Sequence, residues 1–181
     1  MSRMIAVALL VLGLAPSATS AKSISIGVFG GTSIPIVQDD NGSGPLFGVR
    51  APVKLLPLIT VEPFYSSTQC GDKTQDINGT SFTRSGFDIK SFGANAMLTL
   101  GGPVAFYPFV GIGSHSLSRT GSADETLTGY SFGLGVGISP VQSFTIHVRG
   151  EFDNLRKGGS GRAFAAATAG VSYRVFNVAA K

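Results

Sequence analysis

The sequence predicts an all-β fold, an eight-stranded antiparallel up-and-down transmembrane β-barrel preceded by a cleaved signal peptide. Three observations predict it. Apolar residues alternate with small or polar ones along eight segments, which is the period of strands that have two different faces. The connections between these segments are alternately long and short. Charged residues make up only 13% of the chain and glycines number 25, a composition that suits a protein whose outer surface faces lipid.

The first residues have the three-part layout of a secretory signal peptide. A positive start at Ser2-Arg3 precedes the apolar run Met4–Ala15, and small residues follow in Pro16–Ala21. The apolar run is too short to span a membrane as a helix. We therefore expect cleavage after Ala21, with Ser20 as the alternative. Residues 1–21 form the predicted signal peptide, and residues 22–181 form one predicted barrel domain.

The first four alternating segments each place an apolar row on one face, which we expect to meet lipid. These rows are Ile24, Ile26, Val28, Ile34 and Ile36 in Ser23–Val37; Phe47, Val49, Ala51, Val53 and Leu55 in Leu46–Leu56; Ile59, Val61, Pro63 and Tyr65 in Leu58–Thr68; and Phe92, Ala94, Ala96, Leu98 and Leu100 in Phe87–Leu100.

The last four segments continue the pattern, with Val104, Phe106, Val110 and Ile112 in Val104–Leu117; Tyr130, Phe132, Leu134, Val136 and Ile138 in Leu127–Pro140; Phe144, Ile146, Val148 and Phe152 in Ser143–Asn154; and Ala165, Ala167, Ala169, Val171, Tyr173 and Val175 in Ala163–Val175. In Leu127–Pro140 the opposite row is Ser131, Gly133, Gly135, Gly137 and Ser139. A soluble β-sandwich would place Lys, Glu and Thr on this second face. Small residues instead fit the crowded interior of a narrow closed barrel.

The lengths of the connections give the predicted orientation. The long connections are Gln38–Pro45, Gln69–Gly86, Ser118–Glu125 and Leu155–Arg162; the short ones lie at Pro57, at Gly101–Pro103 and at Val141-Gln142. Outer-membrane barrels combine tight periplasmic turns with longer outer loops. The sequence therefore predicts the outer membrane of a Gram-negative bacterium as the location, with both termini periplasmic.

Four stretches resemble the small outer-membrane β-barrel family, the OmpA/OmpX-like type of eight-stranded domain. They are Gly27–Val37, Phe106–Ser114, Gly133–Asn154 and Ala169–Phe176. The last stretch is similar to the C-terminal signal that the barrel-assembly machinery recognises, so the resemblance implies that machinery as a partner. The family usually ends on an outward-facing aromatic residue, whereas here Val175 takes the outward position and Phe176 follows it.

Motifs for other functions are incomplete. The lone Cys70 excludes an internal disulfide and is interpreted as an incidental loop thiol. Asp39–Gly44 begins like a calcium loop, but the required Glu is replaced by Arg50. Gly133, Gly135 and Gly137 do not fit the dinucleotide fingerprint. The net charge of +4 is spread along the chain, which argues against nucleic-acid binding. We expect no cofactor and no metal.

Charged residues on the non-lipid faces predict an interior polar network. Its expected members are Arg50, Lys54, Glu62, His147, Arg149, Glu151, Asp153 and Arg174. A carboxylate pair with a histidine is also compatible with acid–base catalysis. Pairing is the favoured interpretation, because charges inside a narrow barrel are costly to bury without partners. Phe29, Phe64, Tyr107 and Phe109 are the expected bulky fillers of the interior.

An enzymatic alternative comes from outer-membrane lipid A deacylases, which this chain resembles in size and barrel type. Their motif has His and Ser two positions apart on one side of a strand. Here the residue two beyond His115 is Leu117, and Ser116 points to the opposite face. Since a nucleophile must lie within hydrogen-bond reach of its base, no catalytic residue is assigned.

The expected function is therefore that of a non-enzymatic barrel with a plugged interior and a structural or interaction role through its outer loops. The loop cations are Lys73, Arg84, Arg156, Lys157 and Arg162. Such cations suit lipopolysaccharide phosphates, so membrane lipids and lipopolysaccharide are the expected partners of a monomer. The alternatives are a small channel and a lipid-modifying outer-membrane enzyme.

Overall fold

The computed structural model describes residues 22–37, 42–119, 121–157 and 160–178. The predicted signal peptide and its cleavage site lie outside these residues. The strands are β1 (Lys22–Val37), β2 (Gly44–Arg50), β3 (Val53–Lys54), β4 (Ile59–Cys70), β5 (Lys73–Ile77), β6 (Thr80–Arg84), β7 (Phe87–Leu98), β8 (Leu100–Gly101), β9 (Val104–Ser118), β10 (Glu125–Val141), β11 (Phe144–Lys157) and β12 (Ser160–Val178). No helix among the described residues is long and apolar enough to cross a membrane.

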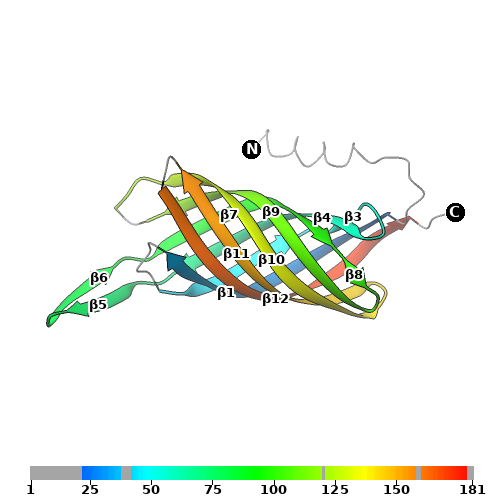
Figure 1. The fold of residues 1–181 in the computed structure, drawn as a ribbon, viewed down its shortest axis with the longest axis horizontal. Coiled ribbons are helices and arrows are strands. Elements are labelled where there is room, and N and C mark those ends of the chain that lie inside the picture. Colours follow the sequence, from blue (N-terminus) through cyan, green and yellow to red (C-terminus); the bar gives the residue numbers. More distant parts are fainter. Residues whose placement is uncertain (1–21, 38–41, 120, 158–159, 179–181) are drawn as a thin grey trace.

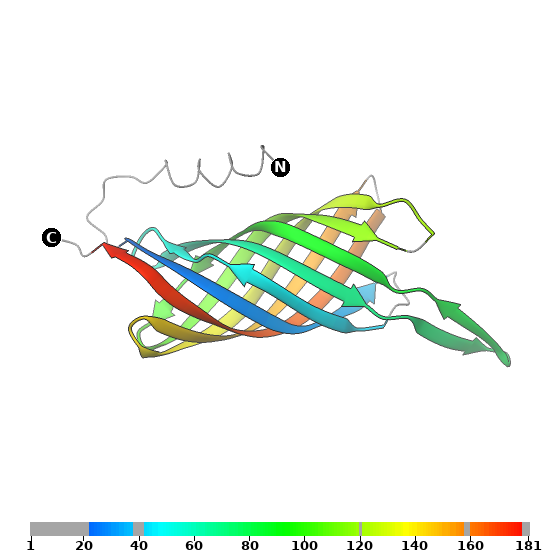
Figure 2. The same cartoon turned by 180° about the vertical axis from the view of Figure 1, so that it is seen from behind.

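The strands form a closed antiparallel barrel of eight staves (Figures 1 and 2). The second stave is β2 with β3, the fourth is β7 with β8, and β12 pairs with β1 to close the cylinder. The strands are staggered around the barrel. When each residue is followed to its partner on the next strand, starting at Ile24 of β1, the circuit returns to β1 at Ile34, which is ten residues further along the chain. The intermediate partners are Val53, Val61, Ala96, Val110, Phe132, Phe152 and Ala165. This stagger accompanies strands tilted about 35–45° to the barrel axis.

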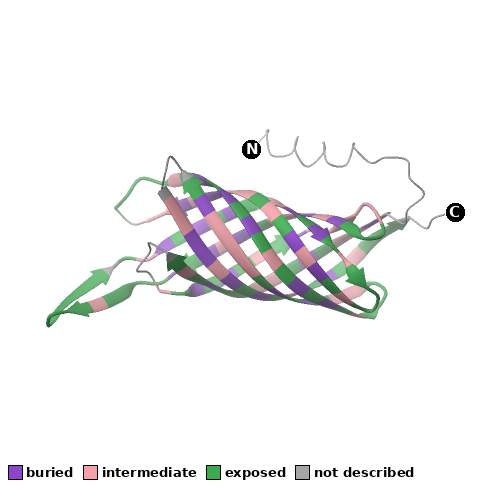
Figure 3. Cartoon of the chain, in the orientation of Figure 1, coloured by how far each residue is buried: buried purple, intermediate pink, exposed green. Residues whose placement is uncertain are grey.

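Burial alternates residue by residue along the staves, as the banding in Figure 3 shows. The outward rows are the predicted apolar ones, and Val136 and Val148 are 42% and 61% exposed. Outward aromatic residues gather at both ends of this apolar belt. They are Phe47, Tyr65, Phe92, Tyr130 and Phe132 towards one end, and Phe106, Tyr173 and Phe176 towards the other. An apolar belt between two aromatic girdles is the surface of a transmembrane barrel.

The two ends of the barrel differ. One end carries both ends of the described chain and the turns at residues 55–58, 102–103 and 142–143. The other end carries the β5–β6 hairpin, which projects beyond the staves (Figure 1). We call these the terminal end and the loop end. Asn78 and Gly79 form the tip of the hairpin with φ values of 54° and 79°, as the two central residues of a type I′ turn require.

The structure corrects several predicted boundaries. The expected single strand Leu46–Leu56 is divided into β2 and β3, because Pro52 between them has no N–H for the ladder. The expected loop Gln69–Gly86 contains the β5–β6 hairpin. The expected long loop Leu155–Arg162 is wrong, because β11 continues to Lys157 and β12 begins at Ser160. In the extended ladder Leu155 pairs with Arg162.

The predicted position of Cys70 in a loop is also wrong. It is the last residue of β4 and is 5% exposed. Its side chain points into the barrel, where it belongs to an apolar cluster near the loop end. The other members are Phe87, Ile89, Leu117, Leu127, Leu155 and Phe164. Every second residue of β4 faces inward. Thr68 is one of these residues, and the strand continues for two more, so the Cys70 side chain also faces inward.

Candidate functional site

The barrel interior brings together most of the polar residues that the sequence predicted for it. Odd-numbered residues of β11 face inward, so His147, Arg149, Glu151 and Asp153 follow one another along a single wall. In β4 the even-numbered residues face inward, among them Glu62. β4 lies across the interior from that wall, and Glu62 reaches Arg149 there. The site is thus built from strands that are distant in sequence.

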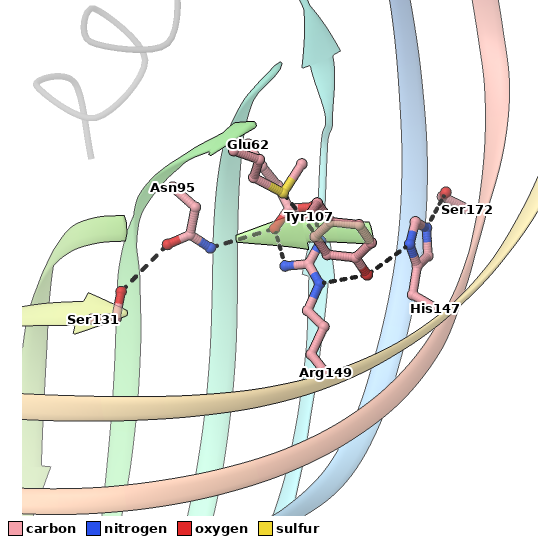
Figure 4. Close-up of polar contacts among 8 residues, drawn as sticks. Glu62, Asn95, Tyr107, Ser131, His147, Arg149 and Ser172 are labelled. Carbon is pink, nitrogen blue, oxygen red and sulfur yellow. Dashed lines mark hydrogen bonds and ion pairs between the residues drawn. The ribbon is translucent and has the colours of Figure 1, made fainter. Parts of the chain in front are cut away.

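The centre of the site is an ion pair between Arg149 and Glu62 (Figure 4). The Nη1 and Nη2 atoms of Arg149 donate to Oε1 and Oε2 of Glu62 at 2.5 and 2.6 Å. This is the two-pronged geometry in which guanidinium and carboxylate bind most strongly. The two side chains are only 4% and 1% exposed, so each charge depends on the other for its stability inside the barrel.

Hydrogen bonds extend this pair in two directions. On one side Asn95 Nδ2 donates to Glu62 Oε1 at 3.4 Å, and Ser131 Oγ donates to Asn95 Oδ1 at 3.4 Å. On the other side Arg149 Nε donates to the Tyr107 hydroxyl at 3.2 Å. The resulting chain runs from β10 through β7 to β4 and then crosses the interior from Glu62 to Arg149 on β11, as Figure 4 shows.

The chain continues through a histidine to β12. Tyr107 Oη lies 3.2 Å from His147 Nδ1, and His147 Nε2 lies 2.7 Å from Ser172 Oγ. Each ring nitrogen of His147 therefore has a hydroxyl partner, one from Tyr107 and one from Ser172. Polar groups that are all partnered in this way form the arrangement of a structural network.

Aromatic and sulfur groups surround the ion pair. The guanidinium of Arg149 lies 5.0 Å from the ring centroid of Tyr107 and 5.3 Å from that of Phe109, and Met97 Sδ lies 3.4 Å from Nη2. These rings require glycines opposite them. A Cβ added at Gly135 would lie 2.2 Å from Tyr107 Cε2, and one at Gly133 would lie 2.5 Å from Phe109 Cζ. The glycine row on β10 therefore provides the space that the rings of Tyr107 and Phe109 occupy.

Arg50 has a different environment from Arg149. Its guanidinium stacks over the Phe29 ring at 4.1 Å, and its Nε and Nη1 atoms are buried without a hydrogen-bond partner. Arg50, Glu151 and Asp153 line a cavity of about 40 Å³. That volume holds a few water molecules at most. The cavity is bounded towards the loop end by members of the apolar cluster, including Leu155 and Phe164.

A serine–histidine contact also lies inside the barrel. Ser91 Oγ on β7 is 2.8 Å from His115 Nδ1 on β9, so His115 does have a serine partner, supplied by the neighbouring strand. Both residues are buried, at 7% and 6% exposure. His115 Nε2 lies 2.3 Å from where a Cβ at Gly129 would be, so this nitrogen faces the barrel wall. The contact has a nucleophile and a base, but among the residues that the structure describes no third group is seen to orient the imidazole from its far nitrogen.

The remaining predicted residues lie outside this centre. Lys54 and Arg174 are near the terminal end, and Arg174 Nε is buried without a hydrogen-bond partner. Lys73 lies on the exposed hairpin, Arg156 near the end of β11, and Arg162 near the start of β12. Arg156 Nε donates to Asn154 Oδ1 at 3.2 Å, and Arg162 lies 3.8 Å from Glu125. The side chains of Arg84 and Lys157 lie outside the described residues, as do residues 39–41 of the calcium-like segment.

Two cations near the loop end were missed by the sequence analysis. Arg119 lies 5.5 Å from the centroid of the Phe87 ring, which Arg162 also approaches to 5.8 Å. Lys90 is exposed on the outward face of β7. Its position in the alternating row with Phe92, Ala94 and Ala96 was the signal that could have identified it. No group of three or more His, Cys, Asp or Glu side chains that could hold a metal ion is found in the described part of the chain.

A closed barrel with an apolar exterior, two aromatic girdles and a paired polar interior defines the class: the chain has the fold of a small eight-stranded transmembrane β-barrel. No protein-family model matches the chain, and no curated protein matches it.

Solved structures of outer-membrane barrels have the same fold. Neisserial surface protein A has a TM-score of 0.64 at 14% identity, covering 86% of this chain and 99% of its own. Ail of Yersinia pestis, in complex with the heparin analogue sucrose octasulfate, has a TM-score of 0.54 at 17% identity, covering 85% and 97%. The N-terminal barrel domain of Pseudomonas aeruginosa OprF has a TM-score of 0.52 at 16% identity, covering 83% and 97%. At these identities the likeness concerns the fold.

Proposed function

We propose that this protein is a non-enzymatic outer-membrane barrel of a Gram-negative envelope, closed inside by its own side chains and acting through its loop end. The apolar belt between aromatic girdles supports membrane insertion. The fold shared with Neisserial surface protein A and with OprF supports the outer membrane as the location. The tight turns lie at the same end as the described termini, which supports a periplasmic position for both.

The closed interior is the observation that carries the proposal. The Arg149–Glu62 pair with Tyr107, Phe109 and Met97 fills the middle of the lumen, and the apolar cluster around Cys70 fills the loop end. Eight staves leave only enough width for side chains. The cavity of about 40 Å³ between these two layers is far smaller than a water-filled channel.

The same closure argues against catalysis inside the barrel. A general base must reach a substrate atom directly or through one water molecule. Ser91 and His115 line the small cavity beneath the apolar cluster, which leaves no space for a lipid or sugar beside them. We therefore assign a stabilising role to the Ser91–His115 hydrogen bond. It connects β7 with β9 and partners two buried polar groups, each of which would be costly to bury without a hydrogen bond.

The loop end is then the working surface. It carries the β5–β6 hairpin with exposed Ile77 and Phe82, and the cations Lys73, Arg119, Arg156 and Arg162. Phosphate and sulfate groups are the natural ligands of such cations. Ail, which shares the fold, was crystallised with a heparin analogue, and we propose lipopolysaccharide as the corresponding anionic partner here. The protein acts as a monomer, and Ala169–Phe176 is the segment offered to the barrel-assembly machinery.

Planar-bilayer recording of the purified, refolded protein tests the closed interior. We expect no steady conductance under conditions in which a general porin, added as the positive control, conducts. A reproducible conductance that is abolished by Gly135→Val, which places a side chain against Tyr107, would show an open lumen and refute the proposal. Gly150→Val is the matched control, because a Cβ at Gly150 has nothing within 4 Å.

A further inference from the structure

The lipid-facing surface of the barrel has a hollow over β4, β7, β9 and β10. The groove has a volume of about 560 Å³ and is lined almost entirely by apolar side chains. Its low point is formed by two alanines of β7, Ala94 and Ala96. Val61 borders it on β4, and the larger side chains Tyr130 and Phe132 border it on β10.

The register shows why the hollow forms there. Val61, Ala96, Val110 and Phe132 are ladder partners in one row, and Pro63, Ala94, Ile112 and Tyr130 are partners in the next. In both rows the β7 residue is alanine while its neighbours on the following staves are large. Ala94 and Ala96 are two residues apart and face outward together. The small residues therefore create a groove in the apolar belt.

A polar row lies beyond this groove towards the loop end, and the outward row of Tyr65, Phe92 and Ser114 lies between the two. Lys90 faces outward on β7 in the same alternating row as Ala94 and Ala96, roughly 13 Å from Ala94 along the strand. Its ladder partners are Ser67 on β4 and Ser116 on β9. Ser67 is an odd-numbered residue of β4 and Ser116 an even-numbered residue of β9, and these are the residues of each strand that face outward. An ammonium group and two hydroxyls therefore form one row at the edge of the belt. Asp88 lies further out on β7, on the side of Lys90 away from the groove.

We propose that the groove and this row together form a binding site for one phosphorylated lipid of the outer leaflet. This inference rests on the proposed membrane location. An acyl chain lies over Ala94 and Ala96, between Val61 and Tyr130. The lipid phosphate accepts from Lys90, Ser67 and Ser116, which are three donors of the kind that phosphate oxygens prefer. A lipid is the favoured occupant because the groove is continuous with the apolar belt and the cation stands at the belt's polar edge.

Native mass spectrometry of the full-length mature barrel, released from lipid nanodiscs, tests the site. The nanodiscs contain phosphatidic acid and diacylglycerol with identical acyl chains in equal amounts. We expect the wild-type barrel to retain phosphatidic acid over diacylglycerol by roughly tenfold, the size of effect that charge-assisted hydrogen bonds give. Inorganic phosphate in excess should displace little of the retained lipid, because the groove binds the chain. If inorganic phosphate displaced all of the retained lipid, the lipid would be held through its phosphate group alone, and the groove would be overturned as part of the site.

Two substitutions separate the parts of the site. Ala94→Phe fills the groove and should reduce retention of both lipids several-fold. Ala167→Phe is its matched control, because Ala167 is an outward-facing alanine on β12, on the opposite side of the barrel. Lys90→Gln should remove the preference for phosphatidic acid while leaving diacylglycerol retention unchanged, and Lys54→Gln on β3, near the terminal end, should change neither.

Equal lipid retention by Ala94→Phe and Ala167→Phe would overturn the groove, and an unchanged lipid ratio in Lys90→Gln would overturn the phosphate site. Release of the wild type as a dimer without lipid would identify a second copy as the occupant and would also overturn the inference. Folding of each variant is checked by its heat-dependent gel mobility, and Ala94→Leu replaces Ala94→Phe should that variant not fold. Failure of the wild-type barrel to enter nanodiscs contradicts the proposed function, whereas insertion without selective retention contradicts this inference alone.

Discussion

Removing the charge of Glu62 should destabilise the barrel strongly, because the buried guanidinium of Arg149 then lacks its counter-ion. Glu62→Gln preserves the shape of the side chain but leaves Arg149 as a buried cation with only neutral partners. Arg149 retains the Tyr107 hydroxyl at 3.2 Å. Of its two contacts to Glu62 at 2.5 and 2.6 Å, the amide oxygen of Gln can replace one acceptor, whereas the amide NH2 group faces the guanidinium as a second donor. Breaking a buried ion pair on one side costs about 3–5 kcal/mol. We expect Glu62→Gln to lower the free energy of unfolding by about 3–4 kcal/mol.

The measurement is equilibrium unfolding by guanidinium chloride in phospholipid vesicles, followed by far-UV circular dichroism and extrapolated linearly to water. Asp124→Asn in the exposed loop at the loop end is the control for removing one carboxylate, and it should change stability by less than about 0.5 kcal/mol. A double-mutant cycle with Arg149→Met then isolates the pair. The double variant should be more stable than the sum of the single effects predicts by about 2 kcal/mol or more.

Two results would refute this reasoning. If Glu62→Gln costs no more than Asp124→Asn, the ion pair contributes little and the plug is held by packing alone. If the effects of Glu62→Gln and Arg149→Met add without coupling, the two side chains do not interact in the folded barrel. Both results can be separated from misfolding by the heat-dependent gel mobility of each variant.

Three further predictions concern the wall, the plug and the loop end. Leu134→Arg, at the middle of the five outward residues of β10, should lower the free energy of unfolding in lipid vesicles by about 2–4 kcal/mol. Ser122→Arg in the loop should lower it by less than about 0.5 kcal/mol. Equal costs in unfolding titrations would mean that the belt does not face lipid. Gly135→Ala should destabilise by about 1–3 kcal/mol through overpacking against Tyr107, and Gly150→Ala, with nothing within 4 Å of its new Cβ, should not destabilise the barrel. The Cys70 thiol should react with a water-soluble thiol reagent only after unfolding, and fast labelling of the folded protein would show that the apolar cluster does not close the loop end.

The alternation of the sequence was sufficient to predict which residues face lipid. Outward and inward positions follow from a period of two within one strand, so the signal is local. Leu127–Pro140 illustrates this, because its predicted apolar row from Tyr130 to Ile138 is the exposed row of β10. The same local rule also aligned His147, Arg149, Glu151 and Asp153 on one wall.

Partners across the interior could not be predicted in this way. Glu62 and Arg149 are 87 residues apart, and Ser91 and His115 are 24 apart. Which inward residues meet depends on the stagger of the whole barrel, and no single strand contains that information. The residues next to His115 on its own strand therefore could not identify its partner, Ser91, which lies on the neighbouring strand. The Asn78-Gly79 dipeptide, in contrast, is a local signal that identifies the β5–β6 hairpin without the barrel.

The apolar cluster at the loop end departs from the polar-inside pattern, and this departure has a physical role. Phe87, Leu117, Leu127 and Leu155 have inward parity on four staves, although their hydrophobicity alone would assign them to the lipid face. Lipid ends below this level, because the outward neighbours on β7 and β11 are Asp88 and Asn154. Where the outer face meets water, apolar side chains are most stable inside, and the strands can extend beyond the membrane around a core of ordinary globular type. This core separates the buried ion pair from the aqueous surface, which strengthens the pair by lowering the polarity around it. The ion pair and the apolar cluster therefore support each other.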